Sequence, residues 1–258
     1  MHARQDRAWK EEVAWASMTM ELLNNVDHHD LRIVTARGRR TEETVNQVLA
    51  LPSEFAALQR HFPIVFRKSA EGPLRPAAIL GLDRDENLFL SEDGSWDAGI
   101  YVPAVLRRGP FAIAEDQAGE PKILVDIDDT RLSRTEGTPI FLPQGGHSPF
   151  LDEIAEVLRT IYTGQAMLDR LMAALERLDL LRPVDLHVRV SEDEVYAISQ
   201  VFVIDGERLA TIGGAELETL HRDGLLAPIF FAAASLDNIQ RLANRKAQAG
   251  GVSAPAGA

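Results

Sequence analysis

The amino-acid sequence predicts an α+β fold, in which an antiparallel β-meander in the middle of the chain is packed by a long helix, a C-terminal hairpin and C-terminal helices. Short apolar runs separated by Gly, Pro, Asp and Asn extend from Pro63 to Ile127, a spacing typical of successive strands. Apolar residues at intervals of three and four from Leu151 to Leu175 predict one long helix. Strict alternation from Val184 to Val190 predicts a half-buried strand, and the apolar run after the following turn predicts its hairpin partner.

The chain has 258 residues, a formal net charge of −12 and no cysteine. This length corresponds to one large domain or two small ones. We expect a single domain over residues 18–246, with a sub-boundary near residues 148–150. Residues 1–17 are predicted to be a flexible arm, and the Ala/Gly-rich residues 247–258 a disordered tail.

Composition also limits the classes of function. The acidic balance argues against general nucleic-acid binding, which requires clustered Lys and Arg. The lack of cysteine excludes disulfides, thiolate metal sites and cysteine nucleophiles. The longest apolar run, Leu225 to Leu236, contains Pro228 and is shorter than the roughly 18 residues that a membrane span needs. Because the N-terminal residues also lack the apolar core of a signal peptide, we expect a cytoplasmic protein without a membrane span.

Short elements are predicted in the first half of the chain. Leu31 to Val34 and Val45 to Leu51 are expected to be strands, the second stopped by the proline that follows it. Ser53 is a predicted N-cap for one or two helical turns. The runs Ile79 to Leu82 and Ile123 to Ile127 are apolar on both sides, which is typical of strands covered on both faces.

The helices of the second half carry recognisable ends. Ser148 and Pro149 suit the N-cap and first position of the long helix, whose apolar stripe is interrupted at Gln165. Gly224 suits a helix C-terminus and Ser235 a helix N-cap. Three further helices are predicted over residues 206–212, 215–224 and from 235 onward.

A candidate ligand site lies between two prolines. Arginine can fork onto a carboxylate or phosphate while its guanidinium stacks on an aromatic ring, so an Arg pair among aromatic residues predicts recognition of an anion. The alternative is that both arginines satisfy carbonyl or carboxylate groups of the protein around a proline-fixed turn. The candidate ligand-binding residues are Arg107, Arg108, Trp96, Tyr101 and Phe111.

Paired carboxylates give an alternative site. Asp126 and Asp128 are two residues apart at the end of an apolar run, so in a strand they share one face and suit a divalent metal, with His147 as a further ligand. The alternative is an acidic strand end in solvent. Adjacent His28 and His29 would point to opposite faces of an extended chain, which is poor geometry for one ion. No cofactor is predicted, and a divalent metal is kept as the weaker alternative.

Seven ordered segments together resemble the SapC family: NNVDHHDLR, HFPIVFRK, AAILGLDRDENLFL, the W…YVPAVLRRGPF turn, VDIDD, RTEGTPIFLP and LHRDGLL…SLDNIQRL. The likeness spans about Met18 to Lys246, and the family is named for an association with S-layer gene clusters. The resemblance implies a bacterial accessory protein in uptake or tailoring of a substrate. It suggests TonB-dependent receptors, halogenase-like proteins and cupin-like oxygenases as neighbours and partners. The resemblance assigns neither an activity nor a catalytic residue to this chain.

Three functions are compatible with these observations. The first is a non-catalytic binding or accessory protein that recognises an anionic small molecule or a protein partner. The second is a metal-assisted enzyme that uses Asp126 and Asp128, with His147 or His28. The third is an S-layer-associated structural protein. We expect the first, because the sequence shows an Arg/aromatic cluster and no catalytic motif.

Overall fold

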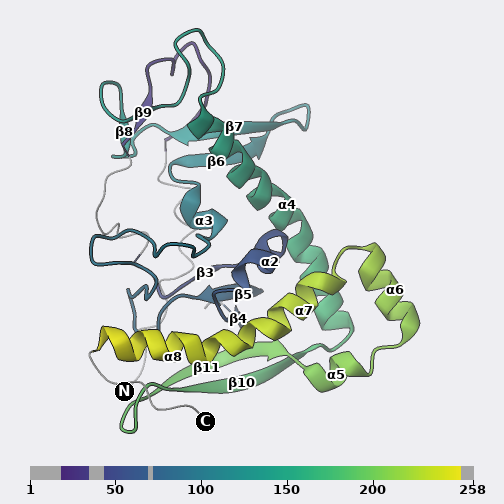
Figure 1. The fold of residues 1–258 in the computed structure, drawn as a ribbon. Coiled ribbons are helices and arrows are strands. Elements are labelled where there is room, and N and C mark those ends of the chain that lie inside the picture. The colour runs from purple at the N-terminus through teal and green to yellow at the C-terminus, as the bar shows by residue number, and fades with distance from the viewer. Residues whose placement is uncertain (1–18, 35–43, 69–71, 251–258) are drawn as a thin grey trace.

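The largest sheet has five antiparallel strands in the order β10-β11-β4-β5-β3 (Figure 1). The computed structural model describes residues 19–34, 44–68 and 72–250, and it confirms the α+β class. The first half of the chain supplies one hairpin of this sheet, and the second half supplies the other. The strands are β3 (Gln47–Leu49), β4 (Ile64–Lys68), β5 (Leu74–Ile79), β10 (Leu181–Arg189) and β11 (Val195–Ile204).

The middle strands do not form one continuous meander, as the sequence suggested, because they divide between sheets. The hairpin β4–β5 belongs to the five-stranded sheet, and the hairpin of β6 (Phe111–Glu115) and β7 (Pro121–Asp126) belongs to a three-stranded sheet with β1 (Met20–Leu22). A small third sheet has the order β8-β2-β9. Its strands are β2 (Arg32–Ile33), β8 (Leu132–Ser133) and β9 (Thr138–Pro139).

The run around Phe89, one of the apolar runs between Pro63 and Ile127 that were expected to be strands, is a turn. The side-chain oxygen of Asn87 accepts the backbone N–H of Phe89 at 3.0 Å, which replaces a ladder hydrogen bond by a local one. Leu90 keeps only an isolated bridge to Trp96. Phe89 is buried, so the run supplies core side chains from a turn.

The long helix α4 (Pro149–Arg177) confirms the predicted stripe and joins the sheets: it starts near β6 and β7 and ends near the five-stranded sheet (Figure 1). Ser148 is its N-cap and accepts the N–H of Leu151 at 3.3 Å. The stripe is continuous, because buried Gly164 takes the slot next to exposed Gln165. A Cβ at Gly164 would lie 2.5 Å from Ser53 Oγ and 2.7 Å from Leu51 Cβ. The glycine lets the segment after β3 approach the helix backbone.

Ser53 is not an N-cap. The segment begins as the 3₁₀ helix η2 (Pro52–Glu54) with Leu51 at its N-cap, and continues as α2 (Phe55–Leu58). The hydroxyl of Ser53 instead donates to the carbonyl of Thr160 in α4 at 2.8 Å. Proline at the first helical position places the start two residues earlier than the serine suggested.

The C-terminal hairpin β10–β11 confirms the alternation read from the sequence. Val188 and Val190 are buried while Asp185, His187 and Arg189 are exposed. A register shift between Val184 and Leu186 interrupts the pairing.

The C-terminal helices are α5 (Gly206–Ala210), α6 (Gly214–Arg222), α7 (Leu226–Ala234), the 3₁₀ helix η3 (Ser235–Asp237) and α8 (Asn238–Ala249). Gly224 has φ +73° just after α6, as the predicted helix end requires. Ser235 is not a cap: its hydroxyl accepts the N–H of Ile64 at 2.8 Å and donates to Ala232. Helix α8 extends through Ala249, past the predicted start of the tail at 247. Residues 1–18 and 251–258, with the predicted arm and most of the tail, lie outside the described residues.

Asn238, the first residue of α8, binds this helix to the turn that precedes β4. Its side-chain amide donates to the carbonyls of Gln59 at 2.8 Å, Phe62 at 3.2 Å and Ser235 at 3.0 Å. Apolar side chains from β4, α4 and the C-terminal helices form one buried cluster around this junction. Among the helices of the described residues, none is long and apolar enough to cross a membrane.

Candidate functional site

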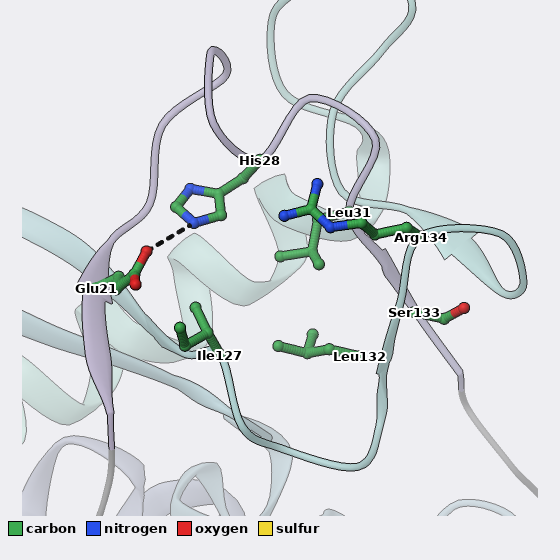
Figure 2. Close-up of a pocket in the computed structure, with 7 residues that line it drawn as sticks. All are labelled: Glu21, His28, Leu31, Ile127, Leu132, Ser133 and Arg134. Carbon is green, nitrogen blue, oxygen red and sulfur yellow. Dashed lines mark ion pairs between the residues drawn. The ribbon is translucent and has the colours of Figure 1, made fainter.

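A hollow of about 360 Å³ opens between the two three-stranded sheets, and we take it as the candidate binding site. Figure 2 shows charged and apolar side chains around it. They come from β1, from the loop before β2 and from the segment between β7 and residue 134. The lining residues are Glu21, His28, Leu31, Ile127, Leu132, Ser133 and Arg134.

The loop that carries His28 is fixed by its own backbone and by Asn24. The side-chain oxygen of Asn24 accepts the backbone N–H groups of Val26 and Asp27, at 3.0 and 2.9 Å. The N–H of Leu31 donates to the carbonyl of His28 at 3.0 Å. The bonds to the Asn24 side chain form an Asx turn, a local structure that Asn favours, and the His28–Leu31 bond closes a backbone turn.

His28 is 3% exposed, and its two ring nitrogens have different partners. Nδ1 accepts the backbone N–H of Asn24 at 3.3 Å, and Nε2 lies 3.4 Å from a carboxylate oxygen of Glu21. In the neutral ring, a nitrogen that accepts leaves the proton on the other nitrogen. Nε2–H therefore faces Glu21 and orients that carboxylate at the edge of the hollow (Figure 2).

Arg134 lies on the other side of the hollow from Glu21 (Figure 2). Its Nη1 pairs with Asp30, and its side chain is 57% exposed. The neighbouring turn is held by the Arg131–Asp129 pair, in which Arg131 Nε donates to Asp129 at 2.8 Å. Gly137, with φ +96°, lets the chain pass against Ile33: a Cβ there would lie 2.7 Å from the carbonyl carbon of Ile33.

The hollow also has an apolar wall. Leu31 belongs to the buried core, and Leu132 is half-buried. Ile127 is 37% exposed. A second hollow of about 320 Å³ at the start of α5 is lined by Arg182, Asp205, Gly206 and Glu207, without a large apolar side chain.

The structure places both arginines of the predicted turn against protein groups. Arg107, at the end of α3 (Ala104–Arg107), forms an ion pair with Glu153 of α4 at 3.1 Å. Arg108 Nη1 donates to the carbonyl of Phe111 at 3.1 Å. Neither arginine lines the two hollows described above.

Tyr101 contacts an acid that sequence reasoning missed. Glu54 is 2% exposed, and its Oε2 accepts the hydroxyl of Tyr101 at 3.0 Å and the N–H of Ala104 at 2.9 Å. Its other oxygen has no hydrogen-bond partner in the described part of the chain. Burial raises the pKa of Glu54 above its ordinary value, and the hydrogen bonds from Ala104 and Tyr101 only partly oppose this. Burial, with the negative charge of Glu54, also raises the pKa of Tyr101.

The two outer aromatic residues pack separately. The ring of Trp96 lies edge-on to Phe62, with centroids 6.4 Å apart. Phe111 is fully buried and lies 6.0 Å from the ring of Phe150. The structure thus brings Tyr101 and Arg107 together around Glu54, while Trp96 and Phe111 contribute to the core. An anion site at this turn stays a prediction.

The predicted metal ligands have neighbours of other kinds. Asp128 Oδ2 accepts the hydroxyl of Thr19 at 2.5 Å, and its N–H donates to Asp126 Oδ1 at 3.3 Å. His147 Nδ1 lies 3.2 Å from Asp152. Within residues 19–34, 44–68 and 72–250, no three His, Asp or Glu residues gather in a way that suits a metal ion. A metal site stays a prediction without further support.

Sequence reasoning missed Glu21 and Arg134 because no local pattern joins them. Arg134 lies in the RTEGTPIFLP segment, and Glu21 lies outside every segment that carried the resemblance. Only the pairing of β1 with β7 and of β2 with β8 brings the two side chains to one hollow.

Comparisons with known proteins complete the description. Searches of curated proteins and of solved structures returned no match. The SapC family model matches residues 23–242, which include every described strand except β1 and every described helix except the last part of α8. The chain therefore belongs to the SapC family.

Proposed function

We propose that this SapC-family chain is a non-catalytic binding or accessory protein, and that it recognises a small charged molecule in the hollow between Glu21 and Arg134. The observation that carries the proposal is the combination of an apolar wall with charged groups that retain hydrogen-bonding capacity. Small-molecule sites typically combine apolar walls with a few placed polar groups, in volumes of roughly 300–1,000 Å³. The hollow, at about 360 Å³, is of this kind.

The proposal moves the site from the Arg107–Arg108 turn to the hollow. Arg107 and Arg108 both have protein partners and line neither of the two hollows described above, whereas Arg134 lines one, which weakens the turn as a site. A role in a bacterial uptake or tailoring system, which the family resemblance implies, belongs to the same proposal, and so does a cytoplasmic location. The neighbours suggested for the family, TonB-dependent receptors and halogenase-like or cupin-like proteins, would then supply or use the ligand.

Two alternatives come from other classes of protein. A metal-assisted enzyme would use Asp126 and Asp128, and elemental analysis of protein purified without chelator would detect its ion. An S-layer-associated structural protein would be exported or would assemble into ordered arrays, which cell fractionation and electron microscopy would detect. Neither alternative accounts for the mixed lining of the hollow.

A thermal-shift screen tests the proposal. We expect hits among small carboxylates, phosphates, amines and amino acids, and we expect Glu21→Gln or Arg134→Gln to reduce them. Glu136→Gln and Arg159→Gln are matched controls, because both residues are exposed and outside the lining of the hollow. A screen without hits, or hits that survive both hollow variants, would contradict the proposed function.

A further inference from the structure

We propose that the hollow takes a small zwitterion with an apolar body, of which a free apolar amino acid is the simplest example. Its ammonium group would face Glu21, its carboxylate would face Arg134, and its side chain would cover Ile127 and Leu132. The inference rests on the proposed function and names its ligand class.

Charge placement separates a zwitterion from a simple anion. Figure 2 shows Glu21 and Arg134 on opposite sides of the hollow, with Ile127 and Leu132 along its floor. A simple anion near Arg134 would face the carboxylates of Glu21 and Asp30, whereas a simple cation near Glu21 would offer no acceptor to the N–H groups of Arg134 that do not bind Asp30. A molecule that carries both charges can place its positive group at Glu21 and its negative group at Arg134. It therefore avoids like-charge contacts at both walls.

Hydrogen-bonding capacity remains on both walls. Arg134 has five N–H donors in a planar fork, and among the described residues its partner is Asp30, through Nη1. Nε and Nη2 are therefore available to a carboxylate in the paired geometry that arginine favours. Glu21 has His28 at 3.4 Å from Oε2, and its carboxylate can accept further bonds from an ammonium group.

The Glu21 wall has a buried partner, His28. The side chain of Glu21 is 49% exposed, but its partner His28 is fixed in the core of the loop. This contact favours one orientation of the carboxylate before a ligand arrives, which lowers the entropy lost on binding.

The apolar wall sets the size of the ligand body. Leu31, Ile127 and Leu132 form a surface suited to a branched aliphatic chain, and the volume of about 360 Å³ accommodates one amino acid. Burying such a chain raises affinity over glycine by roughly tenfold in a half-open site.

Four matched probes test the inference by ligand-observed NMR titration of the full chain. They are L-leucine, 4-methylpentanoate, which lacks the ammonium group, 3-methylbutylamine, which lacks the carboxylate, and glycine, which lacks the apolar body. We expect L-leucine to bind at least about tenfold more tightly than each of the other three, since a charged hydrogen bond is lost in two of them and apolar burial in the third.

Variants locate the binding and separate the two proposals. Glu21→Gln and Arg134→Gln should each weaken L-leucine binding about tenfold or more, Arg134→Lys should weaken it less, and Glu136→Gln and Arg159→Gln should leave it unchanged. Equal binding of 4-methylpentanoate and L-leucine, lost only in Arg134→Gln, would overturn the zwitterion and leave small-anion binding standing. Absence of binding by all four probes would also overturn it, and the broader thermal-shift screen would then decide the proposed function separately.

Discussion

Replacing Gly164 with alanine tests the packing of α4 against the segment after β3. In an exposed helix interior, alanine is more favourable than glycine by about 1 kcal/mol, so the change would ordinarily stabilise the protein. Here the new Cβ would lie 2.5 Å from Ser53 Oγ and 2.7 Å from Leu51 Cβ. Leu51 is fully buried and its Cβ is attached directly to the backbone, so it cannot turn away.

The magnitude follows from these opposing effects. Overpacking a close-packed core costs about 1–3 kcal/mol, and two contacts at these distances belong in the upper part of that range. After subtraction of the helix-propensity gain, we expect Gly164→Ala to lower the free energy of unfolding by about 1–2 kcal/mol. For a chain of this size, the melting temperature should fall by about 2–8 °C.

Urea unfolding followed by circular dichroism measures the effect. Gly214→Ala is the matched control at the start of α6, because a Cβ added there would meet no neighbouring atom within 4 Å, and the change should be neutral or slightly stabilising. Adding Ser53→Ala should recover part of the loss, which a double-mutant cycle would show as a coupling energy. If Gly164→Ala raises the free energy of unfolding, α4 does not approach the segment 51–53 as closely as described.

Three further outcomes follow from other sites. Burial raises the pKa of Glu54 in the folded state, so the contribution of this residue to the free energy of unfolding is full below its ordinary pKa of 4.5 and is lost as the pH rises through the folded value. Glu54→Gln should therefore gain stability relative to the wild type as the pH increases. A parallel pH dependence of the two proteins would contradict this. Gly137→Ala should cost at least about 2 kcal/mol in urea unfolding and weaken ligand binding in the hollow, because φ +96° and the carbonyl of Ile33 both oppose a side chain. Arg107→Ala with Arg108→Ala should cost about 1–2 kcal/mol, because it removes a partly exposed ion pair and one hydrogen bond to the carbonyl of Phe111. It should leave ligand binding in the thermal-shift screen unchanged, and loss of binding would return the site to that turn.

Local periodicity made part of this fold predictable. The stripe of α4 and the alternation of β10 depend on neighbouring residues in sequence, so both were found with nearly correct bounds. The division of the middle strands was not predictable in this way, because β4 pairs with β11 and β7 pairs with β1, far away in sequence. The same reason hid the hollow: Asp30 and Arg134, which pair at its edge, are 104 residues apart.

The site prediction rested on residue types, but the burial and the partners of these side chains decide what they do in the fold. Arginines between aromatic residues predict a recognition surface, but Arg107 has Glu153 as its partner and Phe111 lies in the core. Serine is likewise a typical N-cap residue, but the hydroxyl of Ser235 accepts the backbone N–H of Ile64 instead. In both cases the deciding partner comes from a distant element that no local pattern reveals.

The bonds of Ser235 and Asn238 have a consequence for biosynthesis. Strand β4 and the turn before it leave the ribosome well before the groups that satisfy Ile64 N–H and the carbonyls of Gln59 and Phe62, which are translated 171–179 residues later. Pairings between such remote segments form slowly, and an unpaired strand edge invites association with other chains until they do. Nascent protein should thus depend on chaperones until translation has passed α8, and C-terminally truncated chains should accumulate as aggregates.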